Sequence, residues 1–85
     1  MNRKIYVTNL SPEAGEPELK SLFSKAGNVM SVRIVKDRQT GQSRGIAFVE
    51  MSTLSEARRA ASMLNRKDFM GKSLVAREVN GRSWF

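Results

Sequence analysis

Two aromatic residues in this sequence could bind a flat, unpaired base. Tyr6 and Phe48 each stand in a short segment in which apolar and polar residues alternate. An exposed ring on such a segment is a surface on which a base can stack, and one stack is worth roughly 1–3 kcal/mol. Catalysis has less support, because the chain contains no histidine and no cysteine. The usual general base, the common zinc ligands and a disulfide framework are therefore missing. We expect a binding protein and no enzyme, with no cofactor and no metal.

The charge balance favours an anionic partner. Fifteen lysines and arginines against eight aspartates and glutamates give a formal net charge of +7. Such a field attracts polyanions, although a charge of this size also serves solubility alone. A membrane surface is disfavoured, because no basic helix carries a strong apolar face and no apolar run could cross a bilayer. With 85 residues and no segment like a signal peptide, we expect one monomeric domain inside the cell, in the cytoplasm, with the nucleus left open.

The spacing of apolar residues predicts how the chain positions these groups. Period-two alternation predicts strands, and apolar residues three and four apart predict helices. The predicted strands are Lys4–Asn9, Val29–Lys36, Arg44–Met51 and Ser73–Glu78, and the predicted helices are Glu16–Ala26 and a second one from Thr53 to about Leu64. This βαββαβ order predicts an α+β, ferredoxin-like domain, a four-stranded antiparallel sheet with both helices on one face. We expect the domain to span residues 1–80 and a tail to span 81–85.

Residues at the predicted helix ends support these boundaries. Gly15 is an acceptable N-cap, Pro17 fits the first turn, and Gly27 is a natural C-terminal stop for the first helix. Thr53 and Glu56 have the spacing of a capping box for the second helix. Between the elements, residues 37–43 form a polar turn and residues 69–72 a turn or short hairpin.

With both helices on one side, the other side of the sheet faces solvent. Alternation places on this open face Lys4, Tyr6, Thr8, Arg33, Val35, Arg44, Ile46, Phe48, Glu50, Val75 and Arg77. Exposed aromatic rings on a soluble domain call for a functional explanation. Rings surrounded by arginines suit single-stranded nucleic acid, whose bases are free to stack. Duplex grooves would instead require a helix or ribbon that carries the basic residues.

Two segments resemble the sequence motifs of the RNA-recognition-motif (RRM) family. Residues 5–10, IYVTNL, are similar to its hexapeptide, and residues 44–51, RGIAFVEM, are similar to its octapeptide. The similarity extends from Lys4 to Val79 and includes residues 37–41 and 69–71. Both motifs fall on the strands where the family carries them. The resemblance implies a domain that binds single-stranded RNA and acts in RNA metabolism or post-transcriptional regulation, with single-stranded DNA left open.

The resemblance also implies roles for individual residues. Tyr6 and Phe48 would stack bases, Arg44 would contact the RNA backbone, and Gly45 would allow the strand a close approach. Asn9, at the end of the first strand, would reach the ligand. Residues 77–80 would shape specificity. The full set of expected RNA-binding residues is Tyr6, Phe48, Arg44, Ile46, Asn9, Lys4, Arg33 and Arg77.

Two positions depart from the family pattern. Ile46 stands where a third exposed aromatic is usual, so we expect weaker binding, by about the 1–3 kcal/mol of one stack. Met51 replaces an aromatic on the side that faces the core, which is a packing change. These departures leave an alternative open, a protein–protein interaction module of the same fold with a degenerate RNA surface.

Simpler explanations stay open for several side chains. The arginines of the open face could be solvated strand charges, and Lys36 and Arg38 are expected to be solvated charges in or near the loop. The tail could cover Tyr6. Trp84 and Phe85 could dock on the sheet or belong to a disordered end, and the sequence does not decide between these.

Overall fold

The computed structural model describes residues 3–79. It contains β1 (Lys4–Thr8), α1 (Glu16–Phe23), β2 (Val29–Lys36), β3 (Ser43–Met51), α2 (Leu54–Leu64), β4 (Asp68–Phe69), β5 (Lys72–Ser73) and β6 (Val75–Glu78). The expected tail, residues 81–85 with Trp84 and Phe85, lies outside the described residues, as does Asn80.

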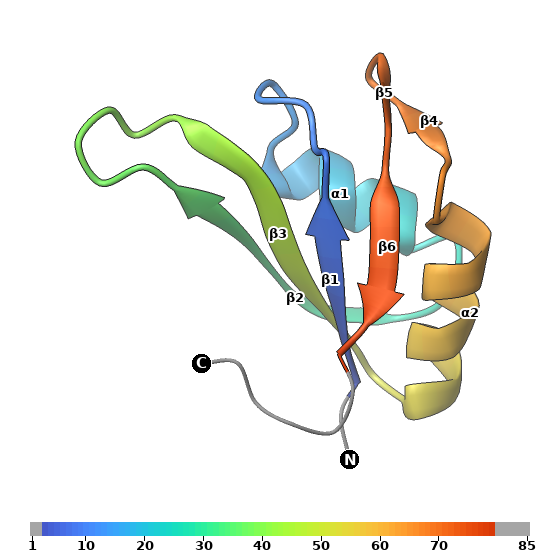
Figure 1. The fold of residues 1–85 in the computed structure, drawn as a ribbon. Coiled ribbons are helices and arrows are strands. Elements are labelled where there is room, and N and C mark those ends of the chain that lie inside the picture. The colour runs from blue at the N-terminus through green and yellow to red at the C-terminus, as the bar shows by residue number, and fades with distance from the viewer. Residues whose placement is uncertain (1–2, 80–85) are drawn as a thin grey trace.

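The main sheet has four strands in the order β2-β3-β1-β6. Each neighbouring pair is antiparallel. Both helices pack on the same side of this sheet, and within residues 3–79 no helix or further strand covers its other side, which we call the open face (Figure 1). The predicted ferredoxin-like βαββαβ arrangement is confirmed.

The core lies between the sheet and the helices. Along β1, Ile5 and Val7 are fully buried, whereas Lys4, Tyr6 and Thr8 keep partial exposure on the opposite face. Burial of a side chain as large as isoleucine contributes roughly 1.5–3 kcal/mol, so this alternation fixes which way each strand faces. The same cluster includes Leu19 and Phe23 of α1, Ala47 and Val49 of β3, and Ala60 and Leu64 of α2.

Both helices start where their capping residues predict. The backbone N–H of Gly15 donates to Glu18 Oε1 at 2.9 Å, and Pro17 lies in the first turn of α1. At α2, Thr53 Oγ1 accepts a hydrogen bond from the backbone N–H of Glu56 at 3.1 Å. The predicted caps are therefore confirmed. Within residues 3–79, neither helix is long and apolar enough to span a membrane.

The end of α1 was predicted wrongly. The helix stops at Phe23 instead of Ala26, and Gly27 is not among the residues with a positive φ, so it is no left-handed stop. A Cβ at position 27 would lie 2.6 Å from Glu56 Cγ. Glycine at this position instead leaves room for the Glu56 side chain of α2. This contact between distant segments explains the glycine, and the local sequence does not reveal it.

The last predicted strand, Ser73–Glu78, is divided in the structure. Its first residue pairs in a short β4–β5 hairpin, and β6 then begins at Val75. Leu74, between the two segments, is fully buried. The hairpin turns through Met70 and Gly71, which both have positive φ. This segment confirms the hairpin that was one of two predictions for residues 69–72.

Contacts from α2 cover part of the outer edge of β6. Asn65 Oδ1, at the end of α2, accepts a hydrogen bond from the backbone N–H of Ala76 at 3.1 Å. Glu78 of the same strand pairs with Arg58 of α2 at 3.6 Å. Exposed edge strands invite pairing with other chains, so these contacts protect part of that edge.

Candidate nucleic-acid interface

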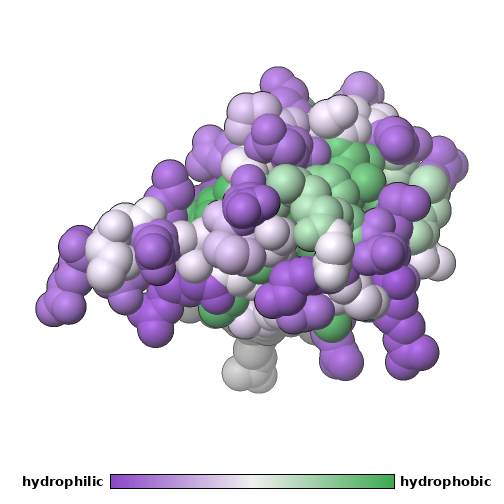
Figure 2. Space-filling view, turned by 90° about the horizontal axis from the view of Figure 1, so that it is seen from above, coloured by the Kyte–Doolittle hydropathy of each residue, from purple (hydrophilic) through white to green (hydrophobic). Residues whose placement is uncertain are grey.

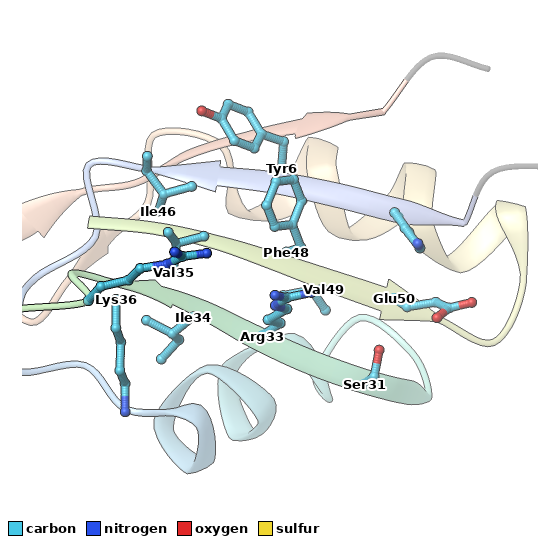
Figure 3. A pocket seen from close by; sticks show the side chains of 12 residues that line it. Tyr6, Ser31, Arg33, Ile34, Val35, Lys36, Ile46, Phe48, Val49 and Glu50 are labelled. Atoms are coloured by element: carbon cyan, nitrogen blue, oxygen red, sulfur yellow. The ribbon is translucent and has the colours of Figure 1, made fainter. Parts of the chain in front are cut away.

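Tyr6 and Phe48 lie side by side at the centre of the open face. They are directly opposite each other on the paired central strands β1 and β3. Their ring centroids are 5.3 Å apart and the ring planes are inclined by 38°. Both side chains are only partly buried, and Figure 3 shows both rings on the side of the sheet away from the helices. The sheet therefore presents two neighbouring aromatic surfaces.

An arginine stands at each side of this ring pair. Arg33 of β2 is opposite Phe48, and Arg77 of β6 is opposite Tyr6. Arg33, Phe48, Tyr6 and Arg77 thus form one row across all four strands, which we call the ring row. Both arginines are exposed. Adjacent strands are about 4.8 Å apart, so the two cations lie near the aromatic surfaces.

Rows of different chemistry lie on either side of the ring row. Toward the start of β1, Glu50 is opposite both Lys4 and Ser31, and these three residues form a polar row. In the other direction, Val35 is opposite Ile46, and Thr8 is opposite Val75. One end of the open face is therefore polar and the other is largely aliphatic.

A shallow hollow of about 710 Å³ covers the β2–β3 half of this face. Its lining residues are Lys4, Tyr6, Ser31, Arg33, Ile34, Val35, Lys36, Arg38, Ile46, Phe48, Val49 and Glu50. Five of the eight expected binding residues are among them, while Asn9, Arg44 and Arg77 are not. The hollow is aromatic in the middle, with Glu50 and Ser31 at one end and Ile46 and Val35 at the other (Figure 3).

Arg44 lies near the β2–β3 loop instead of in the hollow. It is exposed and precedes Gly45 at the start of β3. The neighbouring loop is ordered by Asp37, whose Oδ1 accepts hydrogen bonds from the backbone N–H groups of Gln39 and Thr40. These two bonds lower the pKa of Asp37, and the charge of Arg44 lowers this pKa further. Arg44 is thus close enough to Asp37 for their opposite charges to attract each other.

Gly45 is required by the fold of the protein itself. It has φ +76°, and its carbonyl accepts a hydrogen bond from the N–H of Leu10 at 3.1 Å. A Cβ here would be 3.3 Å from the Leu10 carbonyl oxygen. The segment that approaches Gly45 closely is therefore the β1–α1 loop of the protein itself. The hydrogen bond between Leu10 and Gly45 holds this loop against β3.

Asn9 already has a structural partner. Its φ is +57°, and Asn9 Nδ2 donates to the Ser73 carbonyl oxygen at 2.7 Å. This bond ties the end of β1 to β5. One of the two N–H groups of the amide is thus used within the domain, which leaves its other N–H and Oδ1 for the expected contact with a ligand.

Two basic residues of the hollow were not among the predicted site residues. Lys36 and Arg38, expected to be solvated charges, both line the hollow. The β2–β3 pairing shifts register between Val35 and Lys36. Strand alternation therefore does not predict on which face of the sheet the side chains from Lys36 onward lie. No local pattern indicates this shift.

Seen from above, the β2–β3 loop projects to one side, and hydrophilic side chains surround an apolar area near the middle of the molecule (Figure 2).

Residues 5–75 match the family model described as RNA recognition motif. Together with the βαββαβ fold and its open face, this match identifies the class of protein. The chain belongs to the RNA recognition motif family.

Relatives and solved structures agree with this assignment. The chain is 44% identical over 71 residues to a 29 kDa chloroplastic ribonucleoprotein of Arabidopsis thaliana, covering 84% of this chain and 21% of that protein. It is 40% identical over 72 residues to human cleavage stimulation factor subunit 2, covering 85% of this chain and 12% of that protein. The chain therefore spans 21% or less of the length of these relatives.

Two solved structures show the same fold over most of the chain. The RNA binding protein PG1 has a TM-score of 0.88 and 41% identity, covering 95% of this chain and 98% of its own. The Rna15 RRM with bound RNA (GU) has a TM-score of 0.84 and 26% identity, covering 95% and 86%.

Proposed function

We propose that this domain binds single-stranded RNA across the open face of its sheet and acts in RNA metabolism or post-transcriptional regulation. The role is one of binding and not of catalysis. Tyr6 and Phe48 each stack one base, and the basic side chains around them neutralise phosphates.

The ring row is the observation that carries this proposal. Two rings whose centroids are 5.3 Å apart offer two successive bases separate stacking surfaces. Arg33 and Arg77 extend the row by one strand on each side. Within residues 3–79 neither arginine has an acidic partner within 4 Å, so both charges are available to phosphates. Contact with phosphates releases condensed counterions, which favours binding.

Membership of the RNA recognition motif family supports RNA as the partner. One structural relative, the Rna15 RRM, carries bound RNA, and another is a Sex-lethal protein–RNA complex with 34% identity and a TM-score of 0.85. We extend this partner to the present chain, with single-stranded DNA as a weaker competitor. We also infer an intracellular, cytoplasmic location and a monomeric state.

Truncation of each ring tests the proposal. We expect Phe48→Ala and Tyr6→Ala each to weaken binding by about 1–3 kcal/mol, because each removes one stacking surface. Affinities are measured by fluorescence anisotropy with a labelled pool of random short single-stranded RNA at physiological salt. The matched control is Met30→Ala, which removes an apolar side chain that is 62% exposed and lies in a different groove beside α1.

The control variant is expected to keep wild-type affinity, and all three variants are expected to remain folded. Ring variants that bind as tightly as the wild type would refute the proposal.

Ile46 favours one other function, a protein interaction module whose RNA surface has degenerated. An aliphatic side chain offers no flat surface to a third base, so we expect lower affinity than a face with three rings would have. Chemical-shift mapping separates the two functions. If RNA leaves the resonances of Tyr6, Phe48 and Arg44 unchanged while a protein partner shifts those of the helices, the protein module is the correct assignment.

A further inference from the structure

One acidic residue lies within the cationic open face. Glu50 is the only acidic residue among those that line the hollow within the described chain. It belongs to the polar row and lies two positions after Phe48 on the same side of β3. A carboxylate there repels phosphates, so it opposes the general charge attraction on which RNA binding depends. Its position therefore requires a separate explanation.

A salt bridge alone explains Glu50 poorly. Arg3 Nη2 donates to Glu50 Oε2 at 2.9 Å, and Arg3 Nη1 donates to the Ser52 carbonyl oxygen at 3.2 Å. The side chains are 43% and 28% exposed, and pairs this exposed contribute about 0–1 kcal/mol. Arg3 does, however, orient the carboxylate. Among residues 3–79 no donor to the second oxygen, Oε1, is found.

The position of Glu50 places an acceptor beside a stacked base. Two residues along a strand correspond to about 6.7 Å, which is comparable to the reach of a purine centred over the Phe48 ring. Ser31 and Lys4, on either side of Glu50, complete the polar row, and Figure 3 shows Glu50 and Ser31 at the end of the hollow beyond Phe48 and Arg33. The edge of a base over Phe48 can therefore meet a carboxylate together with cationic donors.

Guanine has the edge that fits this set of groups. Its N1–H and N2 amino group are two adjacent donors, which match the acceptor-only oxygens of a carboxylate. Its O6, next to N1–H, is an acceptor for a lysine or arginine. Adenine and cytosine have an acceptor beside their amino group, and uracil has a single donor between two acceptors. A carboxylate thus meets an acceptor in each of these three bases.

We propose that Glu50 selects guanine at the base position stacked on Phe48, with Arg3 as the positioning residue that holds the carboxylate. The inference rests on the function proposed above and adds a base preference to the same site. Glu50 accepts from guanine N1–H and N2–H, while Lys4 or Arg33 donates to O6.

Short RNAs with one variable base test this selection. Labelled uridine heptamers with guanine, adenine, cytosine or inosine at the central position are titrated against wild type, Glu50→Gln and Glu78→Gln. The last variant removes a charge of the same sign from the helix-facing side of β6, where Glu78 is opposite the buried Ile5. A bidentate contact of this kind is worth roughly tenfold in affinity.

We expect the wild type to bind the guanine heptamer about tenfold more tightly than the adenine heptamer. Glu50→Gln brings this ratio close to one, and Glu78→Gln preserves it. Inosine lacks the N2 amino group, so the wild type is expected to bind it several-fold less tightly than guanine. This measurement needs no variant and holds even if Glu50→Gln fails to fold.

Equal affinities of the wild type for guanine, adenine and inosine overturn the inference, as does a guanine preference that persists in folded Glu50→Gln. Phe48→Ala, measured in parallel, separates this failure from that of the proposed function. If Phe48→Ala weakens binding to all heptamers and no base is preferred, only the guanine inference fails. If Phe48→Ala has no effect on any heptamer, the stacking site itself is wrong.

Discussion

Gly41 and Gly45 have nearly the same backbone conformation in different surroundings. Their φ angles are +74° and +76°, but a Cβ at position 41 would have nothing within 4 Å, whereas one at position 45 would lie 3.3 Å from the Leu10 carbonyl oxygen. Alanine in this region of φ is disfavoured by about 1–2 kcal/mol. Comparison of the two positions separates the conformational effect from the steric one.

We predict that Gly41→Ala lowers the free energy of unfolding by about 1 kcal/mol and that Gly45→Ala lowers it by about 2 kcal/mol or more. Urea denaturation at neutral pH measures both values. Equal losses would mean that the contact with Leu10 relaxes without strain. Such a result would contradict the role given to Gly45 in holding the β1–α1 loop.

At the residue scale, the sequence predicted the side chains whose direction follows from strand alternation. Tyr6, Phe48 and Arg33 lie on the open face for this reason. Asn9 was harder to interpret, because its partner Ser73 is 64 residues away. The place of Arg38 beside the hollow was not expected, because a register shift between β2 and β3 precedes it. Local periodicity carries no information on long-range contacts or bulges.

At the scale of elements, Glu56 joins the start of α2 to the segment that precedes β2. Its carboxylate accepts a hydrogen bond from the Ser52 hydroxyl, and its side chain fills the space beside Gly27. The Ser52 bond is the main cause that lowers the pKa of Glu56 below its ordinary value of 4.5, and backbone N–H groups add to the effect. The ionised carboxylate is therefore favoured in the folded state.

This pKa shift sets the direction of the pH dependence. Because the folded pKa is below the unfolded one, the unfolded state binds more protons, and stability is retained above about pH 4.5 and lost as the pH falls further. Asp37, whose pKa is lowered by the Gln39 and Thr40 N–H groups, acts in the same direction from its ordinary value of 3.8.

We predict that the urea midpoint of the wild type is constant from pH 7 to 5 and falls between pH 5 and 3. Glu56→Gln is expected to show a smaller fall over the same range, because the titrating group is absent. Urea titrations at pH 7, 5, 4 and 3 check this. Glu13→Gln, at an exposed position before α1, serves as the control with an unchanged pH profile. An equal fall in Glu56→Gln and the wild type would contradict the assignment.

The order and type of the main elements followed from the sequence, but two boundaries differed by more than one residue. Alternation and caps locate strands and helix starts because these signals are local. The end of α1 depends on Glu56, an element away, and the break between β5 and β6 depends on burial of Leu74. Both are consequences of packing between elements, which a sequence pattern does not contain.

At the scale of the whole molecule, exposed positive charge lies on both sides of the sheet. Arg33 is exposed on the open face, whereas Arg59 is exposed on α2, which packs on the other side of the sheet. Neither has an acidic partner within 4 Å in the described part of the chain. The two residues therefore allow a comparison between a charge in the proposed interface and an equal charge outside it.

We predict that RNA affinity falls steeply with salt, with a log–log slope of about −0.7 for each phosphate neutralised on a single strand. Arg33→Gln is expected to reduce the magnitude of this slope by about 0.7, while Arg59→Gln leaves it unchanged, because only the first residue releases counterions at the interface. Anisotropy titrations from 50 to about 300 mM salt provide the slopes. A slope reduced equally by both substitutions would indicate non-directional attraction to the whole surface.

The width of the ring row limits how much information one domain can read. Four strands spaced by about 4.8 Å span about 14 Å, enough for about three consecutive nucleotides. A given three-letter word occurs by chance about once in 64 nucleotides, so nearly every transcript contains many copies. Discrimination between transcripts then depends on how densely such words are clustered, since several domains held near one another raise the local concentration of binding sites.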